Sequence, residues 1–178
     1  SSVSMTALKA NVEPSLALMA EVVTKPTFPQ ADFERLKNQR LAGIKQEKNS
    51  PSGLASRLSG KLFFGEGHPY ALPSSGFEAS VAKLTREDVV SFAKEMLNPG
   101  AATLGVVGDT SMAELLPKLE KAFGGWTGGE AKRLTIPEVP LATKPTVWLV
   151  DRPGSQQSVI LVGHPTVTTN NPDEAAIV

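Results

Sequence analysis

The sequence predicts an α+β fold in which helices pack on one face of an antiparallel-rich sheet. Two observations support this prediction. Several stretches repeat apolar residues every three or four positions, which is the spacing of amphipathic helices. Other stretches are short and apolar, or alternate apolar with polar residues, as strands do. Glycine and proline mark the connections between these stretches.

Composition limits the classes of function. The 178 residues suffice to bury one core, or one domain and part of another. Lysine and arginine together number 18, as do aspartate and glutamate, so we expect no nucleic-acid partner. No apolar run approaches the roughly 20 residues of a membrane span. The absence of cysteine excludes disulfides and thiolate metal sites. The chain starts without methionine and stops within a pattern, so we expect a fragment of a longer protein.

The first third of the chain is predicted as one strand and three helices. Residues 2–8 alternate apolar and polar side chains, as a half-buried strand does. A helix follows from Asn11 to Lys25. The longest helix covers 28–51, with acidic residues early and lysines late, which suits the helix dipole. A further helix starts at Pro51 and has Gly65 as a left-handed cap.

The long helix is the predicted scaffold of the fold. Four apolar side chains share one of its faces: Phe33, Leu36, Leu41 and Ile44. The residue before a proline is disfavoured in the α conformation, so Pro51 ends this helix. Periodicity alone favours a core helix with a solvated charged face.

The middle of the chain begins with a loop. Residues 65–76 show no periodicity and no apolar anchors, so we expect the most mobile internal segment there. Thr85 caps the next helix. That helix is predicted to bury Val89, Phe92, Ala93 and Met96. A strand over 101–107 and a helix over 112–123 follow.

A proline-rich linker divides the chain into two domains. Residues 127–145 hold three prolines and show no pattern. Two strands, 146–151 and 157–163, follow it, joined by a turn of hairpin type that also suits a crossing to another sheet. Asn171 starts a helix. The predicted organisation is a first domain over residues 1–126, the linker 127–145, and the opening of a following domain over 146–178.

Several short motifs occur in a characteristic order. They are Gly65-Glu66-Gly67-His68-Pro69-Tyr70, Leu84-Thr85-Arg86-Glu87-Asp88-Val89, Val106-Val107-Gly108-Asp109, Phe123-Gly124-Gly125-Trp126 and Asp151-Arg152-Pro153-Gly154-Ser155-Gln156-Gln157. With the long helix, they resemble the pitrilysin/insulinase zinc metallopeptidases, which include mitochondrial processing peptidase. The resemblance covers nearly the whole chain.

One departure from the family pattern decides the expected function. Aligned on Asn49-Ser50-Pro51, Gly43 stands where active members of the family carry the distal glutamate that binds zinc. The motif His-x-x-Glu-His does not occur in this chain. The resemblance therefore implies an inactive domain without catalytic residues, metal ligands or cofactor. It places zinc in the active domain of the parent protein.

The histidines offer no alternative zinc site. His68 and His164 each lie in a Gly-His-Pro sequence about a hundred residues apart, whereas a catalytic zinc needs three protein ligands. We expect a surface histidine or a structural hydrogen bond, with weak adventitious metal binding as the alternative. The predicted structural motif residues are His68, Pro69, Tyr70, Gly108 and Asp109, and the peptide-binding residues are unknown.

The resemblance implies a non-catalytic part of a zinc metallopeptidase-like protein. Such a domain packs against an active domain and helps to form a chamber for a peptide or protein substrate. A homodimer through residues 146–178 is also expected, because the apolar strands there lack partners. The alternative is that these strands fold back onto the edge of the first domain's sheet. Similar bacterial proteins suggest the periplasm. The alternatives are a stand-alone protein-interaction module and an active enzyme, for which no ligand set is found.

Overall fold

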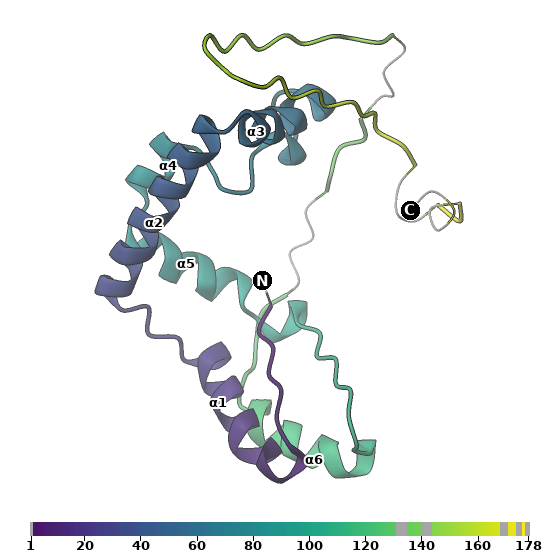
Figure 1. Cartoon of the computed structure of the whole chain (residues 1–178). Helices are drawn as coiled ribbons and strands as arrows, with labels where there is room; N and C mark the ends of the chain where they lie inside the picture. Colours follow the sequence, from purple (N-terminus) through teal and green to yellow (C-terminus); the bar gives the residue numbers. More distant parts are fainter. Residues whose placement is uncertain (1, 131–134, 140–143, 168–170, 174–175, 177–178) are drawn as a thin grey trace. The chain divides into compact units, whose positions relative to one another are not determined.

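The computed structural model of the chain describes residues 2–130, 135–139, 144–167, 171–173 and 176. These residues form six α-helices and three short 3-10 helices (Figure 1). In chain order the elements are η1 Lys9–Asn11, α1 Val12–Thr24, α2 Gln30–Asn49, α3 Pro51–Phe64, η2 Pro69–Ala71, α4 Glu78–Lys83, α5 Arg86–Met96, η3 Pro99–Ala101 and α6 Met112–Phe123.

The predicted α+β class is wrong, because the described part of the chain is all-helical and contains no strand. The four predicted strands, 2–8, 101–107, 146–151 and 157–163, do not form. No backbone hydrogen bond joins any two of these segments within the described residues. A strand exists only where a second backbone exchanges hydrogen bonds with it. The alternation of side chains does not reveal whether such a partner is present.

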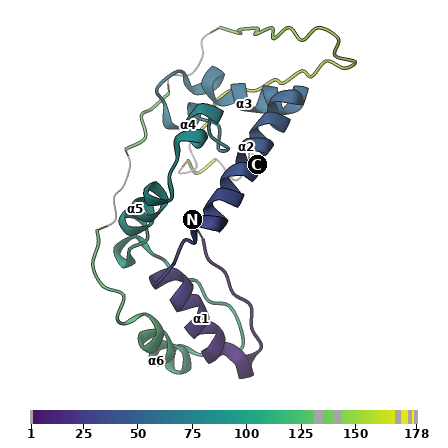
Figure 2. The ribbon, with the colours of Figure 1, turned by 90° about the vertical axis from the view of Figure 1, so that its left-hand side faces the viewer.

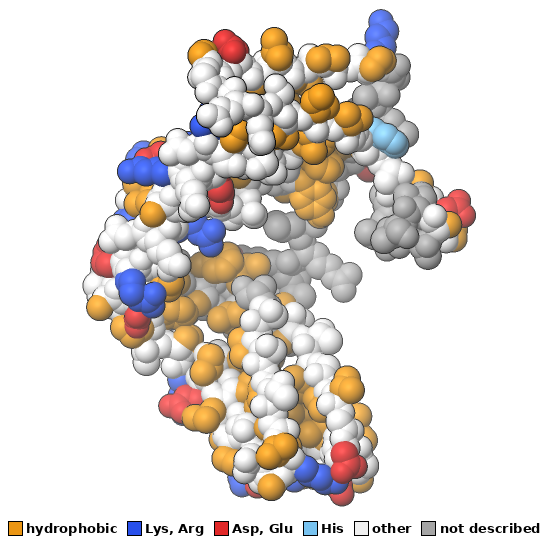
Figure 3. All heavy atoms as spheres, in the orientation of Figure 1, with side chains coloured by type: hydrophobic (Ala, Val, Ile, Leu, Met, Phe, Trp, Pro, Cys, Tyr) orange, Lys and Arg blue, Asp and Glu red, His pale blue; other side chains and the backbone are white. Residues whose placement is uncertain are grey.

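The segments predicted as strands instead expose apolar side chains to solvent. Val107 is fully exposed, and Val147 and Leu149 are exposed by 93% and 92%. Hydrophobic side chains are accordingly visible at the molecular surface in Figure 3. Among the residues that the structure describes, six apolar ones are buried: Leu16, Ala20, Ile44, Ala71, Val81 and Ala93.

The helix predictions are mostly confirmed. The helices α1, α2, α3, α5 and α6 lie where the periodicity places them. The sequence reading missed α4, which at six residues is too short to show a repeat. The prediction that α5 buries Phe92 and Met96 is wrong, because Phe92 is 57% exposed and Met96 is 41% exposed. The neighbouring Ala93 is buried.

The chain forms two compact units, each made of two separate stretches. Unit 1 consists of Ser1–Arg35 and Leu84–Leu134, and unit 2 of Leu36–Lys83 and Thr135–Val178. The predicted domain boundary at the linker 127–145 stays a prediction. None of the described helices is both long and apolar enough to cross a membrane.

In unit 1, α1 and α6 lie side by side (Figures 1 and 2). The buried residues of α1 are Leu16 and Ala20. An ion pair of 3.3 Å between Lys118 Nζ and Glu13 Oε1 links the two helices at the surface. The apolar face that the residue spacing predicts for α1 is therefore partly buried.

The connection from α1 to α2 contains an unusual backbone conformation. Phe28 has φ of +45°, which non-glycine residues rarely adopt. Arg86, the first residue of α5, donates from Nε to the Phe28 carbonyl at 2.5 Å and from Nη2 to the Thr27 carbonyl at 3.0 Å. Thr85 caps α5 as predicted, and Asp88 completes a capping box. The bend before α2 is thus held by the start of α5.

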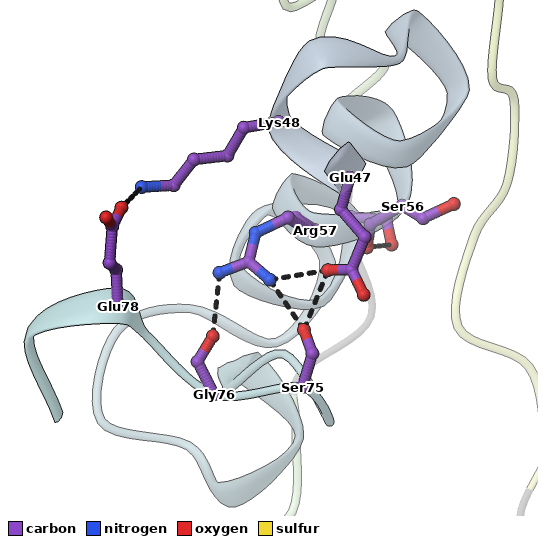
Figure 4. A network of polar contacts seen from close by, with 8 residues as sticks. Glu47, Lys48, Ser56, Arg57, Ser75, Gly76 and Glu78 are labelled. Carbon is purple, nitrogen blue, oxygen red and sulfur yellow. Dashed lines mark hydrogen bonds and ion pairs between the residues drawn. The ribbon is translucent and has the colours of Figure 1, made fainter. Parts of the chain in front are cut away.

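In unit 2, Arg57 of α3 joins three segments of chain (Figure 4). Its side chain is 9% exposed and lies 2.7 Å from Glu47 Oε2 of α2. It also donates to Ser75 Oγ at 2.6 Å and to the Gly76 carbonyl at 2.8 Å. Ser75 Oγ donates in turn to Glu47 at 2.8 Å. One guanidinium therefore connects α2, α3 and the end of the 65–76 loop.

This network changes the acidity of Glu47. The hydrogen bond from Ser75 is the main cause that lowers the pKa of the Glu47 carboxyl below 4.5, and the hydrogen bond from Arg57 adds to it. A carboxyl whose pKa is lower in the folded state stabilises the fold above its unfolded pKa. That contribution disappears as the pH falls through the folded pKa.

The loop over 65–76 is anchored, so the expectation that it lacks apolar contacts is wrong. Its middle forms η2, which packs on α3. Ala71 and His68 of this loop are both buried. A Cβ added to Gly60 of α3 would collide with the carbonyl oxygen of Tyr70. The absence of a side chain at Gly60 therefore permits this close packing.

A turn forms after residue 151, but the segments before and after it do not pair with each other as strands. Ser155 N donates to the Arg152 carbonyl at 3.2 Å, and Gly154 has φ of +80°. Proline second and a glycine of positive φ third are typical of a type II turn. Arg152 Nη2 donates to the Asn49 carbonyl at the last residue of α2. The positive charge at this helix end is favourable for the helix dipole.

The network around Arg57 generates a first prediction. Arg57→Met removes a nearly buried charged donor, so we expect the free energy of unfolding to fall by about 2 kcal/mol. Urea denaturation at neutral pH measures this difference. The difference in the free energy of unfolding should narrow as the pH falls through the lowered pKa of Glu47. Lys48→Met, which removes an exposed pair with Glu78, is the control and should change little. Equal effects of the two substitutions would contradict this role of Arg57.

Two helical glycines generate a second prediction. A Cβ added to Gly43 of α2 meets no atom within 4 Å, so Gly43→Ala should raise the free energy of unfolding by about 1 kcal/mol through helix propensity. Gly60→Ala gains the same propensity but forces the Tyr70 carbonyl away, so it should destabilise. Thermal denaturation of both variants tests the pair. Stabilisation by both would show that the contact at Gly60 is loose.

Candidate functional site

The predicted zinc-ligand position carries no functional group. Gly43 lies in α2, and the space next to its Cα is open. No carboxylate is therefore available at this position. Within the described ranges, no three histidine, cysteine, aspartate or glutamate side chains gather where they could hold a metal ion.

His68 lies in an aromatic cluster, which we define as Phe64, His68 and Tyr70. Its imidazole stacks on the Phe64 ring at 5.1 Å between centroids and 16° between planes. The Tyr70 ring lies 5.3 Å from His68 and 5.4 Å from Phe64, edge-on to the latter. His68 is only 7% exposed. The helix α3 supplies Phe64, and the 3-10 turn η2 brings the other two side chains back onto it.

Both ring nitrogens of His68 make hydrogen bonds. Nδ1 lies 3.1 Å from the backbone nitrogen of Tyr70, which can only donate. Nδ1 is therefore the acceptor, and a neutral ring carries its proton on Nε2. Nε2 lies 3.1 Å from the carbonyl oxygen of Pro137 and donates to it. The proline at 69 starts η2 and fixes the backbone beside the ring.

Gly108 and Asp109, the other predicted motif residues, lie in unit 1, whereas His68, Pro69 and Tyr70 lie in unit 2. The amide of Thr110 donates to the Gly108 carbonyl at 3.0 Å, which makes a tight turn. Asp109 forms an exposed ion pair of 3.2 Å with Lys9. The ion pair of Asp109 thus connects this turn to η1 at the surface.

The residues in the described part of the chain do not fit a catalytic zinc ion. Gly43 provides no ligand atom, and both nitrogens of His68 are engaged. His164 is exposed, and its Nδ1 lies 2.8 Å from the carbonyl oxygen of Pro165. Zinc needs free, convergent nitrogen or oxygen atoms from three side chains.

The sequence reading missed a cleft in unit 1. It has a volume of about 650 Å³ and is lined by the end of α1, the bend at Phe28, one face of α5 and the segment after Trp126. Small-molecule sites commonly have volumes of about 300–1,000 Å³. Arg86 and Trp126 are among its polar and aromatic residues. Both belong to short motifs in the sequence, but the positive φ of Phe28 leaves no signal there.

Comparisons with known proteins agree on one family. The model described as "Peptidase M16 inactive domain" matches residues 83–178. No curated protein matches the chain. A crystal structure of a peptidase M16 inactive domain from Pseudomonas fluorescens is similar, with 32% sequence identity and a TM-score of 0.66. The similarity covers 75% of this chain and 32% of that chain.

These findings confirm the resemblance drawn from the motifs. The family match extends over more than half of the residues, from the end of α4 across α5, α6 and the linker. The chain spans about a third of the length of the solved structure that it matches. The chain belongs to the peptidase M16 family, as part of an inactive, non-catalytic domain.

Proposed function

We propose that this chain is a structural part of a zinc metallopeptidase-like protein. In this role it packs against an active domain of its parent and contributes to the wall of a peptide-binding chamber. The observation that carries the proposal is the match of residues 83–178 to an inactive domain of this family. Gly43 supports it, because no carboxylate stands at the expected ligand position.

The zinc and the catalytic residues belong, on this proposal, to another domain of the parent. Peptidase domains of this kind bind zinc with a histidine pair on one helix and a carboxylate from a second helix. This chain contributes shape and surface instead. Other domains of the same protein, and a peptide substrate held between them, are the proposed partners.

Self-association through residues 146–178 is a further part of the proposal. The apolar side chains of 147–150 and 159–162 are exposed in the described structure. Exposed apolar segments in extended conformation recruit other segments. A second copy of this chain is the proposed partner when other domains are absent.

The absent ligand set generates a third prediction. We expect the purified chain to bind no stoichiometric zinc and to hydrolyse no peptide. Gly43→Glu should not change either result, because one carboxylate cannot hold zinc without histidine ligands. Zinc titration against a chelator and a peptidase assay measure both properties, with Gly43→Gln as the control.

Binding of one equivalent of zinc with sub-micromolar affinity would contradict this prediction. The reading frame of the parent provides a further test. A His-x-x-Glu-His motif in another domain supports the structural role in a peptidase. A parent without this motif would favour a stand-alone protein-interaction module.

The exposed segments generate a fourth prediction. Leu149→Lys and Ile160→Lys each place a charge among exposed apolar residues of 146–162, so they should convert a dimer to a monomer. Val107→Lys changes an equally exposed residue of unit 1 and should leave the dimer intact. Sedimentation velocity measures the oligomeric state. A wild-type chain that is monomeric at every concentration would contradict self-association.

A further inference from the structure

The aromatic cluster of Phe64, His68 and Tyr70 holds the backbone of a distant segment. The Pro137 carbonyl accepts a hydrogen bond from His68 although 69 positions separate the two residues. Pro137 belongs to the linker predicted between the two domains. The buried imidazole therefore does more than stabilise its own loop.

The ring of His68 is fixed before it reaches the linker. The Tyr70 amide occupies Nδ1, and the Phe64 ring stacks on one face of the imidazole. These two contacts direct the Nε2 proton outward from the cluster. A fixed donor beside aromatic rings is a preorganised site for a backbone carbonyl, because little side-chain freedom is lost when the carbonyl binds.

The residues around Pro137 show what kind of ligand the site accepts. The sequence Thr135-Ile136-Pro137-Glu138-Val139 has no regular secondary structure. A residue before proline prefers an extended backbone, and proline itself fixes φ near −65°. Such segments expose their carbonyls and pay little conformational entropy on binding, which is why aromatic-lined surfaces recognise them.

We propose that the aromatic cluster is a binding site for an extended, proline-containing peptide, and that residues 135–139 occupy it in cis. His68 donates to the carbonyl of the proline, and the rings of the cluster form the surrounding surface. Binding at this site requires neither zinc nor a second domain. The chain's own linker thus competes with any free peptide of the same chemistry.

The linker has an advantage over a free peptide because it is covalently attached. Attachment gives a bound segment an effective concentration in the millimolar range. A free peptide should therefore bind the wild-type chain weakly. It should bind at least about tenfold more tightly to a chain whose linker is released.

The test uses the full chain and the peptide acetyl-Thr-Ile-Pro-Glu-Val-amide. A double variant, Ile136→Gly with Pro137→Gly, keeps the carbonyl but removes the conformational restriction, so it should release the linker. Nuclear magnetic resonance of the ring nitrogens of His68 reports binding directly. The same measurement on the wild type should show the proton on Nε2 and contacts between the His68 ring and Pro137.

Two substitutions of His68 separate its two hydrogen bonds. His68→Asn can still accept from the Tyr70 amide but is too short to reach Pro137, so it should abolish peptide binding in the released chain. His68→Gln keeps a donor of suitable length and should retain part of the affinity. Lys48→Met, which changes an exposed residue of α2 outside the cluster, is the control and should leave binding unchanged.

Three results would overturn the proposal. The first is equal binding of the peptide to the released chain and to its His68→Asn form. The second is failure of the peptide to bind the released chain. The third is a wild-type His68 with its proton on Nδ1 or without contacts to Pro137, and this result does not depend on the folding of any variant.

Discussion

Unit 2 depends on the polar interactions of the Arg57 guanidinium. It lies among α2, α3 and the end of the 65–76 loop, and it binds a carboxylate, a hydroxyl and a backbone carbonyl. Ile44, Ala71 and Val81 are the buried apolar side chains among the described residues of this unit, so polar bonds contribute to its order as well. Ser75 and Gly76 end the same loop whose middle forms η2, and η2 packs on α3, the helix that carries Arg57.

The sequence predicted the helices better than the fold class. Helices make their hydrogen bonds within one segment, so periodicity, the Thr85 cap and the terminating Pro51 suffice to place them. Strands make their bonds to another segment, and the apolar segments 146–151 and 157–163 have no such partner among the described residues. The fold class was wrong because it rested on a property of pairs of segments.

The sequence likewise predicted only part of the candidate site. Gly43 and His68 were found from motifs, because each is defined by its position relative to nearby prolines and glycines. The stacking on Phe64 and the bond to Pro137 could not be foreseen. Neither the turn that brings the ring back to α3 nor a contact over 69 positions leaves a local pattern. The network of Glu47, Arg57 and Ser75 was missed for the same reason.

The bend at Phe28 links the order of two parts of unit 1. The positive φ of Phe28 is unfavourable for a residue other than glycine. The Phe28 carbonyl accepts a hydrogen bond from Arg86, the first residue of α5. If the first turn of α5 unwinds, Arg86 moves and the bend loses its restraint. If the bend relaxes, α5 loses two partners at its first turn. We therefore expect the connection between α1 and α2 to unfold together with the start of α5 as one cooperative element, although 58 positions separate Phe28 and Arg86.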